Sequence, residues 1–378
     1  RDRFFLDPGH MSPMLYSVLS MVGTISNQEL QNFRQWGSVT AGHPEVDHNL
    51  GIENTSGPLG QGHTMAVGAA IAEKFLTQRF GSWMHHKIYT FISDGGIQEE
   101  ISQGAGRIAG HLGLQNLIMF YDSNDIQLST ETKDVSSEDT ALKYQAWGWR
   151  TITIEGNNPD EIRNALTLAN QETAKPTLIL GKTIMGKRLV DEAGNSFERK
   201  CSTHGQPVSK AGASVAKTIE NLGGNPSNPF EVFADVAKYW KTVNENKTKQ
   251  AEIKKQEQKN WEKQNPELAK KLEDFYSGKL PQIDFSKIQQ KSDTATRVAS
   301  KTVLEYFAET IENIVVSSAD LSNSDNTDGF LKKTKAFTRN DFSGKFLESG
   351  VAELTMASIM NGMVLHGGVF AACATFFV

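Results

Sequence analysis

Two residues with oxygen-bearing side chains follow two neighbouring apolar runs of the chain. Asp94, in the sequence SDGG, comes directly after the run 88–92, and Asn124 follows the run 116–121. If both runs are parallel strands, their carboxyl ends lie at one edge of a sheet, where ligands of such sheets bind. Carboxylate and amide oxygens suit Mg²⁺, which completes its coordination shell with phosphate oxygens and water. The pair therefore predicts a site for a metal-bound diphosphate.

A helical segment is expected from Gly95 onward, between the two strands, and its first free N–H groups are expected to point at the same anion. Around this segment the chain alternates between helix and strand patterns from residue 60 to residue 185. Such alternation builds a parallel sheet with helices on both faces, so the predicted fold class is α/β. We expect helices at 62–80 and 159–172, and strands at 88–92, 116–121, 151–154 and 177–182.

A polar segment divides the chain into two α/β regions. Residues 244–273 are rich in Lys, Gln and Glu and predict a solvated helix or helix pair. A second alternating region follows, with an expected helix at 295–312, a strand at 314–318, a helix that ends near residue 365 and a buried strand at 371–378. We predict a first domain at 1–262, truncated at its start, a linker at 263–293 and a second domain of the same type at 294–378, truncated at its end.

Composition excludes several functional classes. The chain has 378 residues, of which 38% are hydrophobic and 22% charged, as in ordinary globular proteins. The net charge is −5 and glutamates are interleaved with the linker lysines, which argues against nucleic acid as a partner. Two cysteines favour a reducing compartment. Residues 354–378 carry no charge, but Asn361, His366 and two adjacent glycines argue against a membrane span.

Six further motifs occur along the chain in the order found in one enzyme family. They are LDPGH (6–10), AGHPE (41–45), GPLGQG (57–62), STHG (202–205), SADL (318–321) and GVAE (350–353). Together with Asp94 and Asn124, they resemble the thiamine-diphosphate-dependent transketolases, although Ser93 stands where the family has glycine. The resemblance covers the whole chain. It implies the diphosphate-binding domain, the linker and the first part of the pyrimidine-binding domain, without the rest of that domain or the C-terminal domain.

The resemblance implies a metal site and a cofactor site. Asp94, Asn124 and the backbone carbonyl of Ile126 are expected to bind Mg²⁺, with Ca²⁺ or another divalent cation also possible. The apolar side chain of Leu59 is expected to hold thiamine diphosphate in a bent conformation. The residues expected to contact the cofactor are His10, Gly57, Pro58, Leu59, Asp94, Gly95, Asn124, His204, Glu353 and Phe376.

The resemblance also implies the catalytic residues. A glutamate at the position of Glu353 hydrogen-bonds the aminopyrimidine ring and promotes loss of the thiazolium C2 proton. Beside apolar neighbours, we expect this carboxyl group to be partly buried. His10, His43 and His204 match family positions that contact diphosphate or sugar hydroxyls and transfer protons. The six other histidines, including His63, are expected to be structural, because they show no spacing typical of metal ligands.

The implied function is a reversible transfer of a two-carbon ketol group, for example from xylulose 5-phosphate to ribose 5-phosphate in the pentose phosphate pathway. Arg297, Ser324 and His204 are expected to bind the sugar phosphates. The implied assembly is a cytoplasmic homodimer whose active sites take Asp94 from one subunit and Glu353 from the other. Three alternatives stay open: 1-deoxyxylulose-5-phosphate synthase, a dehydrogenase E1 component, and a fragment that binds the cofactor only. We expect this fragment to be inactive alone.

Overall fold

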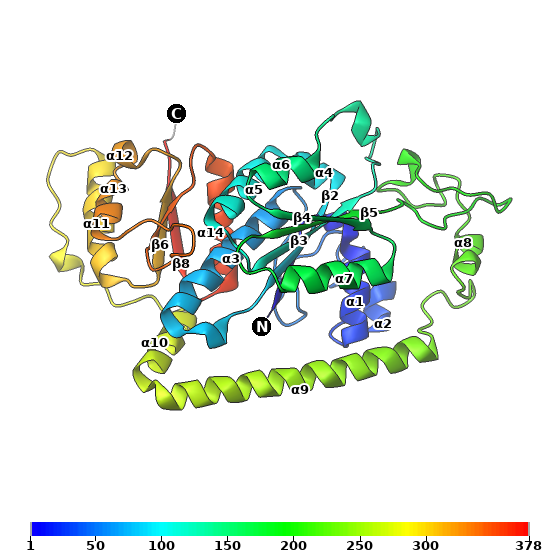
Figure 1. Ribbon diagram of the computed structural model, residues 1–378, viewed down its shortest axis with the longest axis horizontal. Helices are drawn as coiled ribbons and strands as arrows, with labels where there is room; N and C mark the ends of the chain where they lie inside the picture. The colour runs from blue at the N-terminus through cyan, green and yellow to red at the C-terminus, as the bar shows by residue number, and fades with distance from the viewer. Residues whose placement is uncertain (1, 377–378) are drawn as a thin grey trace.

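The computed structural model describes residues 2–376, which form two parallel α/β units connected by a long helix (Figure 1). The sheet of the first unit is entirely parallel. Its strands lie in the order β1 (Arg3–Leu6), β2 (Ile88–Ser93), β3 (Leu117–Ser123), β5 (Thr177–Lys182) and β4 (Arg150–Glu155). The α/β prediction and the four predicted strands of this unit are confirmed, whereas β1 was not predicted as a strand.

Alternate residues of these strands are buried on opposite faces of the sheet, as the two-residue period of a strand requires. On one face Ile92 and Met119 pack with α3 (Gln61–Phe80) and α5 (Glu100–Leu112) in the main core. On the other face Ile118 and Ile179 pack against α7 (Pro159–Asn170). Three further helices belong to this unit: α1 (Ser12–Val22), α2 (Asn27–Gln31) and α6 (Thr140–Ala146).

The helix expected from Gly95 onward is two helices, which corrects the prediction of a single one. A short α4 (Asp94–Gln98) precedes α5, and Glu99 between them has an extended backbone (φ −56°, ψ 138°). The break lies where Gly60 packs closely on Glu99: a Cβ atom at Gly60 would lie 2.8 Å from Cβ of Glu99. Because of the break, Asp94 lies in a short helical turn that is separate from α5.

The second unit has a three-stranded parallel sheet in the order β7 (Phe346–Glu348), β6 (Ile314–Ser318) and β8 (Phe370–Ala374). Its helices are α11 (Thr296–Thr310), α12 (Ser322–Asp325), α13 (Asp328–Lys333) and α14 (Glu353–His366). The last strand was expected to be buried, but β8 lies at an edge of this sheet, where β6 is its one partner among the described residues, and most of its residues are half-buried. Residues 377–378 of that predicted strand lie outside the described residues.

The polar segment 244–273 lies in two successive helices, one of the two arrangements predicted for it. A short α8 (Val215–Asn221) precedes them. The long α9 (Ala234–Gln264) buries none of its residues and runs along the lower side of the molecule in Figure 1. It meets α10 (Pro266–Tyr276) at Asn265, where proline restarts the helix at its first position. The predicted domain limits, 1–262, 263–293 and 294–378, stay predictions.

Two glycines bring the units into backbone contact where α3 crosses α14. A Cβ atom at Gly68 would lie 2.0 Å from the carbonyl oxygen of Ile359, and one at Gly362 would lie 1.9 Å from that of Met65. Neither distance leaves room for a side chain. The crossing therefore holds α14 close to the first unit (Figure 1).

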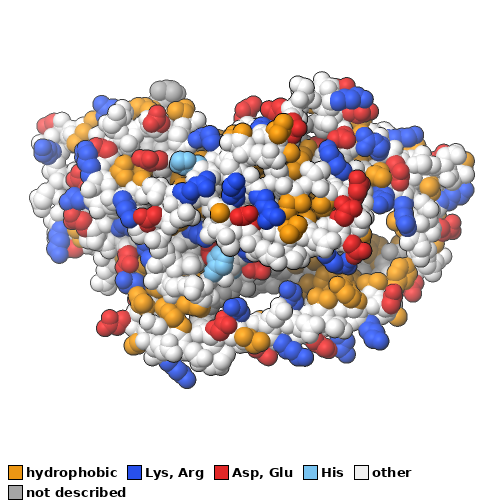
Figure 2. Space-filling model, in the orientation of Figure 1, with side chains coloured by type: hydrophobic (Ala, Val, Ile, Leu, Met, Phe, Trp, Pro, Cys, Tyr) orange, Lys and Arg blue, Asp and Glu red, His pale blue; other side chains and the backbone are white. Residues whose placement is uncertain are grey.

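The surface carries charges of both signs. Lys and Arg side chains alternate with Asp and Glu side chains over the face in Figure 2, including along α9. Within residues 2–376, no helix has both the length and the apolar character needed to cross a bilayer.

Candidate active site

A cavity of about 540 Å³ lies at the carboxyl ends of β2 and β3. The register of the two strands pairs Ser93 with Asp122, so the residues that follow each of them reach the same edge of the sheet. The cavity lining includes seven of the predicted site residues: His10, Leu59, Asp94, Gly95, Asn124, Ile126 and His204. An adjoining cavity of about 830 Å³, which also contacts His10, Asn124 and His204, continues between the sheet and α7.

Asp94 is a buried carboxylate, 3% exposed, without a cationic partner among the described residues. Its oxygens accept hydrogen bonds from the Tyr121 hydroxyl (2.6 Å) and from the backbone N–H groups of Asn124 (3.0 Å) and Asp125 (2.9 Å). Burial raises its pKa. The nearby cations, Lys182 and Arg199, lie 4.0 and 3.9 Å from Asp125 instead. A buried charge that no side chain neutralises suits a divalent cation.

The loop after β3 makes a turn directly after Asn124. Asp125 has a left-handed conformation (φ 66°), and the Asn124 side-chain oxygen accepts a hydrogen bond from Ile126 N (3.0 Å). That oxygen has a second lone pair available for a metal. Among the described residues, no three His, Cys, Asp or Glu side chains form a metal site. A metal ion at this site would depend on the oxygen atoms of Asp94, Asn124 and the Ile126 carbonyl, a donor set whose chemistry fits Mg²⁺.

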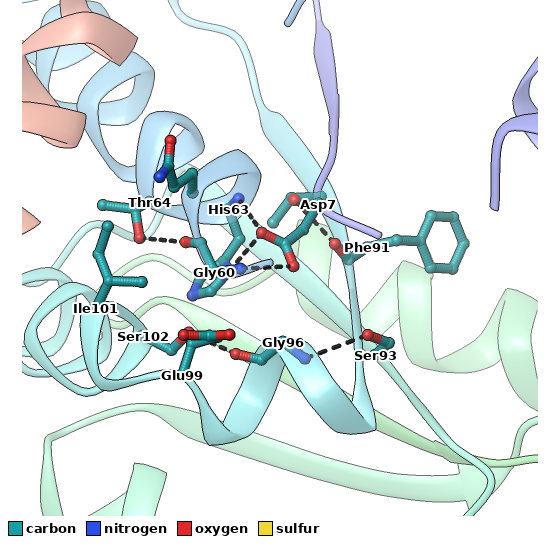
Figure 3. A network of polar contacts seen from close by, with 12 residues as sticks. Asp7, Gly60, His63, Thr64, Phe91, Ser93, Gly96, Glu99, Ile101 and Ser102 are labelled. Carbon is teal, nitrogen blue, oxygen red and sulfur yellow. Dashed lines mark hydrogen bonds and ion pairs between the residues drawn. The ribbon is translucent and has the colours of Figure 1, made fainter. Parts of the chain in front are cut away.

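The N–H groups after Asp94 are less free than expected. The Ser93 hydroxyl accepts a hydrogen bond from Gly96 N (3.2 Å), so this donor is engaged within the protein (Figure 3). The Leu59 side chain lies over Gly95, where a Cβ atom would be 2.8 Å from its Cδ1. The Leu59 side chain therefore packs directly on this turn, and it would have to shift to make room for a side chain at position 95.

Two of the three predicted histidines line the cavity, and the third lies beside the loop that contains Gly57. The rings of His10 and His204 are 5.1 Å apart and both line the cavity. The exposed His43 is not among the lining residues, but its ring packs against Gly9 and Gly57. Burial, together with the neighbouring His204 and His43, lowers the pKa of His10 to about 4. Burial also lowers the pKa of His204, so His10 and His204 are predominantly neutral near pH 7.

His204 also presents a buried ring nitrogen. Within the described part of the chain, its Nδ1 has no hydrogen-bond partner. Such groups are normally satisfied by protein, water or a ligand. Its position on the cavity lining fits the expectation that this imidazole contacts a bound molecule.

Four predicted residues lie away from this cavity. Glu353, the first residue of α14, is exposed rather than partly buried, because the buried face of this helix begins with Thr355 and Met356. Arg297 is exposed on α11, the Ser324 hydroxyl contacts Asn323, and Phe376 is 41% exposed beyond β8. A single chain therefore does not unite these residues with Asp94.

Sequence reasoning missed several residues that support the cavity. Tyr121 was assigned only to a strand, although its hydroxyl donates a hydrogen bond to the Asp94 carboxylate. Asp7 and His63 form a buried pair below the Leu59 loop. From the sequence, His63 was expected to be structural and Asp7 was not considered as a site residue. The position of Asp7 within the LDPGH motif was a signal for a site role, whereas no local pattern connects it with a residue 56 positions later.

Comparisons with known proteins agree with this geometry. Residues 1–281 match the transketolase thiamine diphosphate binding domain, and residues 292–378 match the transketolase pyrimidine binding domain. The transketolases of Halalkalibacterium halodurans and Bacillus subtilis are each 39% identical to the chain, over 388 and 399 residues. All of this chain is covered, but only 57% of each relative.

Solved structures give the same result. Transketolase from Leishmania mexicana superposes with a TM-score of 0.93 at 30% identity, covering 100% of this chain and 56% of that one. A Pichia stipitis transketolase in complex with sedoheptulose 7-phosphate gives a TM-score of 0.90 at 31% identity, covering 100% and 57%. The matched domains, the relatives and the cavity geometry agree, and the chain belongs to the transketolase family.

Proposed function

We propose that this chain supplies the Mg²⁺–thiamine diphosphate site of a transketolase, which transfers a two-carbon ketol group from a ketose phosphate to an aldose phosphate. The observation that carries the proposal is the convergence of Asp94, Asn124 and Leu59 with His10 and His204 around one cavity. Relatives over the whole chain are transketolases, which supports this activity over the synthase and E1 alternatives. Related structures contain fructose 6-phosphate and sedoheptulose 7-phosphate, which supports sugar phosphates as substrates.

The chain's own residues have distinct roles in this proposal. Asp94, Asn124 and the Ile126 carbonyl hold the cation, and Leu59 supports the cofactor from below. When bound, thiamine diphosphate supplies an electron sink for the carbanion formed by C–C cleavage. Neutral His10 and His204 accept protons from, or donate hydrogen bonds to, sugar hydroxyls at the cavity.

The remaining predicted residues require a second subunit. Glu353 is exposed beside Leu354 (63% exposed) and Val351 (75% exposed), an apolar surface around a single carboxylate. We propose that this surface meets the Asp94 cavity of a second copy in a homodimer, where Glu353 contacts the aminopyrimidine ring. Arg297 and Ser324 would then bind the substrate phosphate, and Phe376 would lie near the pyrimidine. Both cysteines are free thiols, which supports a reducing, cytoplasmic location.

A chain that only binds the cofactor is the second candidate. It is favoured by the position of the predicted phosphate-binding residues Arg297 and Ser324, which are not among the residues that line the cavity. The two candidates share cofactor binding and differ in catalysis.

Calorimetric titration of thiamine diphosphate, run beside a coupled assay of ketol transfer from xylulose 5-phosphate to ribose 5-phosphate, separates them. We expect binding in the presence of Mg²⁺ and a dissociation constant at least about a hundredfold higher in EDTA, because the diphosphate then loses its cation. Transfer by the chain supports the transketolase and contradicts the expectation that this fragment is inactive alone. Binding without transfer supports the binding-only candidate. Absence of both contradicts the proposed site.

A further inference from the structure

A buried carboxylate–imidazole pair lies below the Leu59 loop. Asp7 follows β1 and is fully buried, and His63, in the first turn of α3, is 2% exposed. One oxygen of Asp7 accepts from His63 Nδ1 (3.2 Å) and His63 N (3.3 Å), and the other accepts from Gly60 N (3.2 Å). Figure 3 shows these contacts converging on the carboxylate. Asp7 thus provides the side-chain acceptor that the N-cap residue of α3, Gly60, lacks.

The same carboxylate also contacts the turn that carries Asp94. A Cβ atom at Gly96 would lie 2.5 Å from Oδ2 of Asp7, and one at Gly62 would lie 2.5 Å from its Cα atom. Asp7 therefore lies between Gly60, whose N–H group it binds, and the 94–96 turn, and a side chain at Gly96 would collide with its carboxylate. Both segments contain residues expected to contact the cofactor.

The imidazole has a feature that helix capping alone does not require. Within residues 2–376, Nε2 of His63 is buried and has no hydrogen-bond partner. A buried ring nitrogen left unpaired is unfavourable by roughly 1–3 kcal/mol. Capping needs only the Asp7 carboxylate and the two backbone donors, so the contact from His63 Nδ1 to Asp7 is additional to capping.

We propose that Asp7 and His63 are positioning residues that set the height of the Leu59 loop above the Asp94 turn, and so determine the affinity for Mg²⁺–thiamine diphosphate. The inference rests on the proposed function of this cavity. Neither residue touches the cofactor in this account. Asp7 acts through the backbone of Gly60, and His63 acts by fixing the Asp7 carboxylate.

A matched control pair exists on the same helix. Glu73, 1% exposed, accepts from His85 Nδ1 (2.8 Å) and from His86 N (3.2 Å). Ten residues of helix place it about 15 Å from His63. Glu73→Gln therefore disturbs a buried carboxylate that binds an imidazole, here the exposed His85, far from the cavity, and it reports what a purely structural loss does.

The test compares Asp7→Asn, His63→Phe and His63→Asn with Glu73→Gln. Hydrogen exchange of the cofactor-free chain, read by mass spectrometry, is the first arm. We expect Asp7→Asn to speed exchange in peptides covering 57–62 and 93–98, because one amide oxygen cannot serve three donors. Glu73→Gln leaves these peptides unchanged. Unchanged protection of these peptides in Asp7→Asn would overturn the inference, whether or not the parent chain binds cofactor.

Titration with thiamine diphosphate and Mg²⁺ is the second arm. We expect Asp7→Asn and His63→Phe to raise the dissociation constant at least about tenfold, whereas Glu73→Gln stays within about twofold of the parent chain. His63→Asn, which restores a donor near the Nδ1 position, should recover most of the affinity. If the parent chain and all variants bind the cofactor with equal affinity, the positioning role of Asp7 and His63 is overturned, and the proposed function is not. A parent chain that does not bind would contradict the proposed function, and the exchange arm would still decide the positioning role.

Discussion

Replacing Asp94 with asparagine is expected to weaken binding of Mg²⁺ and thiamine diphosphate at least about a hundredfold, on the order of 3 kcal/mol, while the chain stays folded. The carboxylate is the only charged group in the proposed oxygen set, and no described cation lies within ion-pair distance of it. An amide keeps one oxygen for the Asn124 and Asp125 N–H groups but presents no negative charge to the metal. Titration calorimetry gives the affinity, and circular dichroism verifies the fold.

Asp125→Asn is the control for this substitution. Asp125 is the next residue after Asn124, is 47% exposed at its side chain, and faces Lys182 and Arg199 rather than the cavity. We expect its affinity for the cofactor to change by less than about threefold, because exposed ion pairs contribute little. Equal losses in Asp94→Asn and Asp125→Asn would mean that the general negative charge of this region, and not a metal ligand, governs binding.

Replacing Gly362 with alanine is expected to lower the free energy of unfolding by about 3 kcal/mol, the upper part of the range for overpacked cores. The new Cβ atom would lie 1.9 Å from the Met65 carbonyl oxygen, a backbone atom that cannot rotate away. The α3–α14 crossing must therefore open, and α14 shifts relative to the first unit. Urea denaturation measures the loss, and hydrogen exchange of 61–80 locates it.

The neighbouring Asn361 provides the matched control. It is exposed on the same helix, so Asn361→Ala should change the free energy of unfolding by no more than about 0.5 kcal/mol. A Gly362→Ala chain as stable as the parent would show that the two helices do not meet at backbone contact. Because α14 begins with Glu353, this result would also remove the basis for locating that residue.

The strands could be predicted because each is a continuous apolar run. The runs 88–92 and 177–182 became β2 and β5 with at most one residue of difference. The carboxyl ends of β2 and β3 determine the site, since Ser93 of β2 pairs with Asp122 of β3. The pairing of Asp94 with the Asn124 loop followed from this simple rule, without any knowledge of side-chain packing.

What could not be predicted depends on contacts between distant segments. β1 has four residues and is recognisable as a strand mainly through its pairing with β2. The break at Glu99 lies where Gly60, 39 positions earlier in the chain, packs against it. The Asp7–His63 pair depends on β1 and α3 meeting below the cavity. Glu353 is exposed in the single chain for a related reason, because apolar neighbours in sequence do not cover a side chain at the start of a helix.

The most direct test of the account is to locate the cation. Crystals of the chain grown with thiamine diphosphate and Mn²⁺ in place of Mg²⁺ give an anomalous difference peak at the metal. The account predicts a peak about 2.1–2.2 Å from oxygens of Asp94, Asn124 and the Ile126 carbonyl, bridged to the diphosphate. A bound cofactor whose metal lies away from Asp94, or whose diphosphate binds with no metal at this edge of the sheet, would contradict it.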